Sequence, residues 1–215
     1  MALIGFTDFQ RKIPNGKIFV ANTSFLIKSL TSTIEGKLLA KLKVEFLKKS
    51  SLVYNVTIRN EILHFLRSQM IKNAVESKNI TPNNTFMSFW KMKKDDHNLL
   101  KLICDQGYAE IFRSVFGENG EKLEEQFNIT TYGCDYGSPK SGKEPTWKDV
   151  HKIMSVYGLD SSDAMILNMA ISDSTYSGLI TCDRDFRVCG NIPELKDFDI
   201  ILDDKARHLP TRAWN

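Results

Sequence analysis

The chain has 215 residues, of which 42% are hydrophobic and 26% are charged. These are ordinary values for a globular protein of this length, so the composition excludes a fibrous, low-complexity or largely disordered chain. The 29 basic and 26 acidic residues leave a net charge of +3, which is compatible with nucleic-acid binding but far too small to identify it.

Strand and helix patterns alternate in the first part of the chain. The apolar run Lys17 to Ala21 predicts a short buried strand, and the capping residues Asn22 to Ser24 predict that a helix follows it. Leucine and phenylalanine at helical spacing predict an amphipathic helix over residues 37–49, whose lysines face solvent. A second strand is predicted over Ser51 to Val56.

A helix is predicted to follow the second strand, and the pattern then weakens. Thr57 is predicted to cap this helix, which carries Glu61 in its first turns. The next stretch, up to about residue 149, contains turn-rich and Gly/Ser/Pro-rich segments around a predicted helix. We therefore predict a helical and loop insertion over approximately residues 77–149.

Regular patterning returns after this insertion. Helices are predicted over residues 147–157, ended by Gly158, and over about 161–172, and strands over residues 178–182 and 198–202. Strands that alternate with helices indicate an α/β fold with a mainly parallel sheet. We predict that residues 1–215 form a single domain of this class.

Polar side chains are predicted to gather at one edge of this sheet. Asn22 and Asp183 each follow a predicted strand directly, and ligands bind parallel sheets outside the carboxyl ends of their strands. Glu61 lies early in the helix after the second strand, and Asp163 lies in the first turn of a later helix. Several acids are therefore expected to converge at this edge.

Each of these acids also has a purely structural interpretation. Asp183 and Asp185, two residues apart directly after a strand, either hold a ligand or bond backbone amides of their own turn. Asp163 is either a site acid or part of a capping box that Asp160 begins. Glu61 is either a site acid or an acid on the helix surface.

Four short segments together resemble the signatures of the PIN-domain nuclease family. They are Ile18 to Leu26, Val56 to Leu63, Tyr157 to Ala170 and Thr181 to Phe186, in the order in which the family has them. The resemblance covers about residues 18–66 and 147–203 and leaves the middle of the chain unmatched.

This resemblance implies a three-layer α/β/α sandwich with a mainly parallel central sheet, together with Mg²⁺ or Mn²⁺ at an acidic cluster. It also implies hydrolysis of RNA phosphodiester bonds, because the cation activates water and neutralises charge on the phosphate. By position, Glu61, Asp163 and Asp183 would hold the metal. Ser24 or Asp185 would orient water or phosphate.

Asn22 departs from the family pattern, which has an aspartate at this first ligand position. Its amide oxygen can contact a cation but brings no negative charge, and Mg²⁺ and Mn²⁺ are held chiefly by carboxylate oxygens. Metal affinity and rate should therefore both be weakened. The change marks either a naturally weakened member or an inactivating substitution.

An aromatic and basic stretch over residues 86–94 is a candidate contact for single-stranded RNA. Aromatic side chains stack on bases and lysines pair with phosphates, and the lysines concerned are Lys91, Lys93 and Lys94. The alternative is an aromatic stripe that faces the core, with lysines in solvent.

The beginning of the chain shows no signal peptide, and no apolar run is long enough to span a membrane. The four cysteines, Cys104, Cys134, Cys182 and Cys189, form no C-x-x-C pair. We therefore expect a cytoplasmic protein with reduced, mostly structural thiols and no membrane contact.

The sequence thus favours a Mg²⁺- or Mn²⁺-dependent endoribonuclease. The resemblance adds that many members of the family are VapC-type toxins, which are neutralised by a small antitoxin protein and are often homodimers. An RNA-processing or DNA-acting nuclease is an alternative. A catalytically degenerate module that binds RNA or protein is another, because Asn22 makes it credible.

Overall fold

A computed structural model describes residues 3–29, 31–55, 57–65, 130–131, 146–192, 195 and 197–204. The chain divides into two compact units, residues 1–59 with 129–215, and residues 60–128. All described residues except 60–65 belong to the first unit.

The first unit is built on a six-stranded sheet with the order β1-β6-β5-β2-β3-β4. Every neighbouring pair of strands is parallel. The strands are β1 (Leu3–Gly5), β2 (Ile18–Ala21), β3 (Ser51–Tyr54), β4 (Thr130–Thr131), β5 (Tyr176–Ile180) and β6 (Asp199–Leu202).

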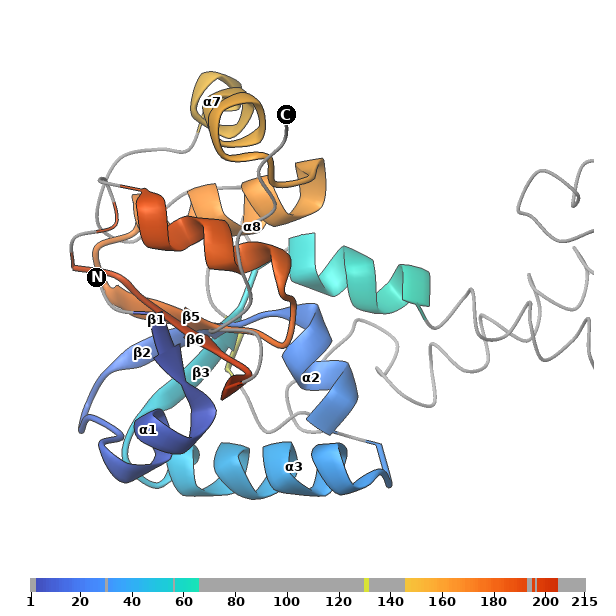
Figure 1. The fold of residues 1–215 in the computed structure, drawn as a ribbon, viewed down its shortest axis with the longest axis vertical. Helices are drawn as coiled ribbons and strands as arrows, with labels where there is room; N and C mark the ends of the chain where they lie inside the picture. Colours follow the sequence, from blue (N-terminus) through green and yellow to red (C-terminus); the bar gives the residue numbers. More distant parts are fainter. Residues whose placement is uncertain are drawn as a thin grey trace, which may run out of the picture. The chain divides into compact units, whose positions relative to one another are not determined.

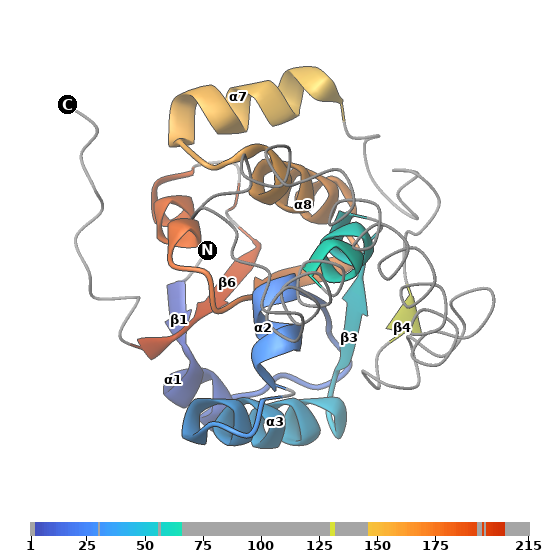
Figure 2. The same cartoon turned by 90° about the vertical axis from the view of Figure 1, so that its right-hand side faces the viewer.

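Helices lie on both sides of this sheet, with α1 and α3 on one side and α8 and η2 on the other (Figures 1 and 2). This arrangement confirms the predicted α/β fold with a mainly parallel sheet, and it is compatible with a three-layer sandwich. The helices are α1 (Phe6–Arg11), α2 (Thr23–Ser29), α3 (Ile34–Leu47), an unlabelled helix over residues 57–65, α7 (Trp147–Tyr157), α8 (Ser161–Ser172) and the 3₁₀ helix η2 (Asp185–Asn191).

The core between the sheet and α1 and α3 is built around three phenylalanines. The ring centroids of Phe9, Phe19 and Phe46 lie 5.3 to 5.6 Å apart, within the range in which aromatic rings interact favourably. Gly178 lets the Phe19 ring approach β5, because a Cβ there would overlap that ring and the Asp199 carbonyl oxygen. The strands are buried at their carboxyl ends, as expected for a parallel sheet covered on both faces.

Helix caps confirm two predicted boundaries and correct a third. Gly158 ends α7 in the left-handed conformation with φ of 74°, and α8 begins at Ser161 after the Asp160 side-chain cap, which was one of two interpretations left open. Thr57 was predicted to cap the helix after β3, but the Asn55 Oδ1 atom accepts the Ile58 amide at 3.0 Å instead. The Thr57 hydroxyl donates to the Met169 sulfur at 3.7 Å.

The first strand and helix have no counterpart among the predicted elements. β1 pairs with β6, so that Leu3 lies opposite Ile200. After β6, the Asp204 carboxylate accepts the Thr7 hydroxyl at 2.7 Å and the Thr7 amide at 3.2 Å. Asp204 therefore caps α1 across 197 residues of sequence.

The predicted insertion over residues 77–149 lies largely outside the described residues and stays a prediction. Of this range, the structure describes residues 130–131, which form β4, and residues 146–149, which belong to the start of α7 and its cap.

Candidate functional site

The carboxyl ends of β2, β5 and β6 lie side by side. Ala21 is opposite Ile180, and Ile180 is opposite Ile201, so the next residues along each strand meet at one edge. Asn22 and Thr181 are the first polar residues beyond these ends, and both are buried. Asn22 therefore lies at the edge where polar side chains were expected to gather.

Thr181 connects the predicted site residues at this edge. Its hydroxyl oxygen accepts a hydrogen bond from the Asn22 side-chain amide at 3.0 Å and another from the Asp183 backbone amide at 3.0 Å. The Ser24 hydroxyl oxygen lies 3.1 Å from the same atom and accepts the Cys182 amide at 3.1 Å. Segments about 160 residues apart in sequence are thereby joined by one buried hydroxyl.

The number of donors fixes the direction of these hydrogen bonds. A hydroxyl has one proton and two lone pairs, and two donors already occupy both lone pairs of Thr181. The Thr181 proton must therefore go to Ser24, whose oxygen also accepts the Cys182 amide. The proton of Ser24 is then directed away from this network.

Asp183 plays part of the structural role that the sequence left open. One of its carboxylate oxygens, Oδ1, accepts the Asp185 amide at 2.9 Å, which makes a turn of the kind in which an aspartate bonds a backbone amide two residues on. Asp185 is exposed at the start of η2. The turn fixes the Asp183 carboxylate just beyond the end of β5.

Asp163 also combines a structural and a candidate functional position. Its backbone amide is bonded by Asp160 at 2.9 Å, and its side chain lies in the first turn of α8, buried. Only residues 173–175 join α8 to β5, on which it packs, so α8 runs antiparallel to the strand and begins at the carboxyl edge. Asp163 is close enough to Cys189, in η2, to help raise the pKa of that thiol.

The remaining predicted site residues lie outside the described part of the first unit. Glu61 lies on the helix over residues 57–65 but belongs to the second unit, residues 60–128, so its place in the cluster stays a prediction. Lys91, Lys93 and Lys94 lie outside the described residues.

Asn55 is a second polar residue that sequence reasoning missed. It follows β3 as Asn22 follows β2, and the register of β2 with β3 places the two asparagines side by side at the carboxyl edge. Its Oδ1 atom caps a helix, whereas its Nδ2 atom is buried and has no hydrogen-bond partner among the residues that the structure describes. A buried donor without a partner is costly. The predicted strand ran to Val56 and so included Asn55, whereas β3 ends at Tyr54; the earlier end of the strand is what places Asn55 at this edge.

A divalent cation fits this edge only in part. Asp163, Asp183 and the Asn22 amide oxygen are the hard oxygen ligands that Mg²⁺ and Mn²⁺ prefer. Within the described part of the chain, however, no three Asp, Glu, His or Cys side chains are grouped to hold a metal ion. An aspartate at position 22 would add a carboxylate to the predicted set, which the neutral amide does not.

Neither described cysteine is suited to be a nucleophile. Cys182 and Cys189 are buried free thiols, and burial raises the pKa of each to about 12. A thiol must ionise to attack a substrate or to bind metal, so both remain protonated near neutral pH. Lys28, held by Glu35 at 3.0 Å, lies near enough to Cys182 to oppose this effect partly.

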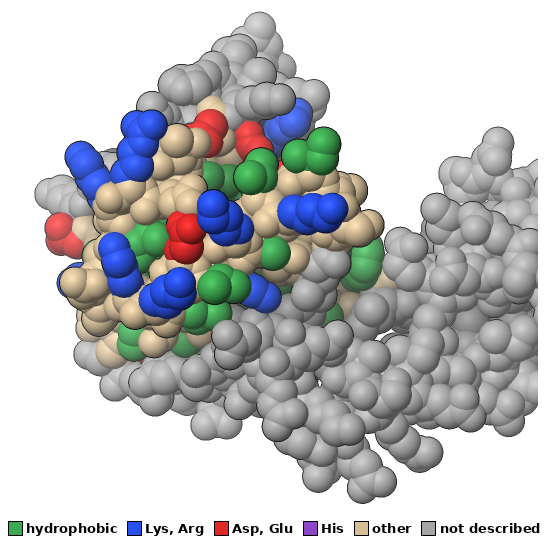
Figure 3. Space-filling model, turned by 90° about the horizontal axis from the view of Figure 1, so that it is seen from below, with side chains coloured by type: hydrophobic (Ala, Val, Ile, Leu, Met, Phe, Trp, Pro, Cys, Tyr) green, Lys and Arg blue, Asp and Glu red, His purple; other side chains and the backbone are tan. Residues whose placement is uncertain are grey.

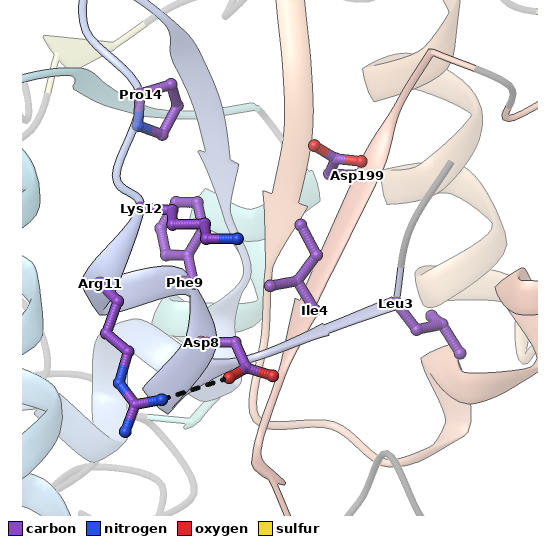
Figure 4. A pocket seen from close by; sticks show the side chains of 8 residues that line it. All are labelled: Leu3, Ile4, Asp8, Phe9, Arg11, Lys12, Pro14 and Asp199. Atoms are coloured by element: carbon purple, nitrogen blue, oxygen red, sulfur yellow. Dashed lines mark ion pairs between the residues drawn. The ribbon is translucent and has the colours of Figure 1, made fainter.

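A separate pocket of about 630 Å³ lies at the opposite edge of the sheet (Figure 4). Leu3 and Asp199, which line it, begin β1 and β6, and the strands are parallel. None of the predicted site residues lines this pocket. Its remaining lining residues are Ile4, Asp8, Phe9, Arg11, Lys12 and Pro14.

No known protein family, curated protein or solved structure matches this chain. No helix among the described residues is both long enough and apolar enough to cross a membrane.

Proposed function

We propose that this protein is a PIN-like, Mg²⁺- or Mn²⁺-dependent endoribonuclease whose activity is weakened by Asn22. The observation that carries the proposal is the meeting of Asn22, Ser24 and Asp183 around the Thr181 hydroxyl at the carboxyl edge of a parallel sheet. Asp163 lies in the first turn of α8, which begins at the same edge. These are four of the positions that the family resemblance selects.

The residues have distinct roles in this proposal. Asp163 and Asp183, with Glu61, would hold the cation, which supplies water activation and neutralises charge on the phosphate. Ser24 can donate its proton to a phosphate oxygen or to water, because its lone pairs are taken by Thr181 and the Cys182 amide. The unpaired Asn55 amide is a further donor near this edge.

Asn22 supports low activity in two ways. It lacks the negative charge that attracts a hard cation. The Asn22 side-chain amide also donates a hydrogen bond to the Thr181 hydroxyl, which a carboxylate cannot do. The asparagine therefore makes Thr181 the acceptor in this contact. In Asn22→Asp, the Thr181 proton would turn to the new carboxylate, and Ser24 would donate to Thr181.

The test is Asn22→Asp, assayed on a mixed RNA pool with Mg²⁺ or Mn²⁺ and with EDTA as the control. A positioned electrostatic group commonly contributes about 10² to 10³ in rate, so cleavage should rise by this order. Adding Asp183→Asn should abolish the gain, because both groups act on one cation.

Asn15→Asp is the matched control, since it makes the same chemical change on an exposed loop before β2. It should leave cleavage unchanged. If Asn22→Asp stays folded, binds Mn²⁺ no better than the wild type and cuts no RNA, the nuclease proposal is wrong.

A catalytically degenerate binding module is the second candidate. The incomplete group of acids among the described residues and the Asn22 amide bond to Thr181 favour it. Such a module should bind RNA equally well with EDTA present and should never cleave it. The family resemblance also leads us to propose an antitoxin partner, a homodimer, and an RNA-processing or DNA-acting role as an alternative. RNA contacts by Lys91, Lys93 and Lys94 are proposed from the aromatic and basic stretch over residues 86–94.

A further inference from the structure

The outer face of α3 exposes aliphatic side chains that the core does not use. Ile34 is 83% exposed, Leu38 is 64% exposed and Val44 is 53% exposed. They stand among exposed lysines of the same helix and of its C-cap, Lys48. We call this surface the α3 face and define it by Ile34, Lys37, Leu38, Lys41, Val44 and Lys48.

Helical geometry separates the α3 face from the side of α3 that packs on the protein. Leu39, Leu42 and Phe46 are buried, and they occupy the side turned to the core. Ile34, Leu38 and Lys41 follow the spacing i, i+4 and i+7, so they form one row along the exposed surface of α3, and Leu38 borders the buried Leu42. The helix has 14 residues and is about 21 Å long at 1.5 Å per residue.

The charge of the α3 face is positive. Lys37, Lys41 and Lys48 outnumber the one acid among them, Glu45, which contacts Lys41 at 4.0 Å and the Gln10 amide. The other acid of α3, Glu35, pairs with Lys28 at 3.0 Å. Arg11 on α1, the helix that packs beside α3, is exposed and pairs with Asp8 at 4.0 Å, so it adds no net charge to this surface. The view from below shows lysine and arginine side chains interspersed with hydrophobic ones (Figure 3).

This mixture disfavours three kinds of partner. Nucleic acid would pair with the lysines but would cover the aliphatic side chains without gain. A bilayer needs an apolar face segregated from the charges, whereas Lys41 lies between the aliphatic residues along the helix. A second copy of the α3 face would set lysines against lysines, and the acids beside them are engaged.

We infer that the α3 face is a docking surface for an acidic, amphipathic helical segment of another protein. Leucine- or isoleucine-type side chains of that segment would cover Ile34, Leu38 and Val44. Its aspartates or glutamates would pair with Lys37, Lys41 and Lys48 at the rim. The inference does not depend on the proposed nuclease activity, because α3 lies across the sheet from α8 and contains no candidate site residue.

The test is selection of helical peptides of about 18 residues, roughly five turns, from a display library on the full-length protein. The library varies acidic, basic, polar and aliphatic residues. Selected peptides should carry acids and leucine-type residues at helical spacing. Each is then resynthesised, and its Kd is measured by fluorescence anisotropy.

Two variants of the α3 face separate the two kinds of contact. The double variant Ile34→Ser with Leu38→Ser should weaken the selected peptides by about tenfold or more, as loss of buried apolar anchors does. The triple variant Lys37→Gln, Lys41→Gln and Lys48→Gln should weaken them and flatten the salt dependence of Kd. Val156→Ser with Lys148→Gln on α7 is the matched control, since these residues are also exposed, and it should change nothing.

Several results would overturn the inference. One is selection of peptides without acidic enrichment, and another is binding that survives both α3-face variants. Single-stranded RNA, phosphatidylserine vesicles and self-association, the last measured by sedimentation, are assayed on the same variants. If any of these three is the interaction that the α3-face substitutions abolish, the surface serves that partner and not an acidic helix.

Discussion

Replacing Thr181 with valine removes one hydroxyl from the middle of the candidate site. Valine has nearly the same shape as threonine, so Thr181→Val leaves no appreciable cavity at this fully buried position. It does delete the atom that accepts the Asn22 and Asp183 amides and donates to Ser24. The loss of stability should therefore report the network alone.

The size of the stability loss depends on which hydrogen-bond partners of Thr181 can bond water instead. The Asn22 side chain is 2% exposed, so its amide donor would be left buried and unpaired, which costs about 1 to 3 kcal/mol. Ser24 and Asp183 are half-buried and can bond water, so their lost bonds add about 1 kcal/mol. We expect Thr181→Val to lower the free energy of unfolding by about 2 to 4 kcal/mol, or about 2 to 4 °C in Tm for each kcal/mol.

The assay is urea unfolding followed by circular dichroism, with Thr181→Ser as the control. Serine keeps the hydroxyl and loses one buried methyl group, which costs about 1 kcal/mol. Combining Thr181→Val with Asn22→Ala should cost less than the sum of the single changes, because the two residues share a bond. The reasoning fails if the effects add within about 0.5 kcal/mol, or if Thr181→Val is as stable as Thr181→Ser.

Three further predictions concern other parts of the first unit. Burial raises the pKa of Cys182 and Cys189 from 9.0 to about 12, so the unfolded state loses these protons first. The free energy of unfolding should be unaffected by the thiols below pH 9 and should fall between about pH 9 and 12, by up to about 1.4 kcal/mol per pH unit for each thiol. Urea melts of a Cys182→Ala, Cys189→Ala variant should lack this pH slope. If the variant keeps the same slope, the thiols are not its cause. Asp204→Ala should cost about 0.5 to 2 kcal/mol through the lost α1 cap. Gly5→Ala should be destabilising only while Asp204 is present, because its Cβ would overlap that carboxylate, and a double-mutant cycle with additive effects would exclude the contact.

Local sequence patterns predicted the elements whose signals lie within a few residues. α8 begins and ends as expected because Asp160 caps it and its apolar residues keep helical spacing. β2 follows from an uninterrupted apolar run of the kind that a sheet covered on both faces requires. The common edge of Asn22 and Asp183 follows from parallel strands alone, whatever their order.

The remaining features depend on contacts between distant segments. β1 is three residues long and is recognisable as a strand only beside β6. Thr181 was placed inside the strand predicted over residues 178–182, whereas β5 ends at Ile180. Its role depends on β2 and β5 being neighbours, and strand order has no local signature. Asn55 took the cap expected of Thr57 because its side chain reaches the Ile58 amide from outside the helix.

The cap that Asp204 places on α1 has a consequence for how the protein is made. A ribosome adds about 5 to 20 residues per second, so about 10 to 40 s separate the synthesis of Thr7 from that of Asp204, its partner 197 positions later. During this interval β1 has no β6 beside which to form, and the Thr7 amide lacks the Asp204 carboxylate that caps α1. The opening segment of the chain must therefore join the sheet among the last steps of folding, and contacts of such long sequence separation form slowly.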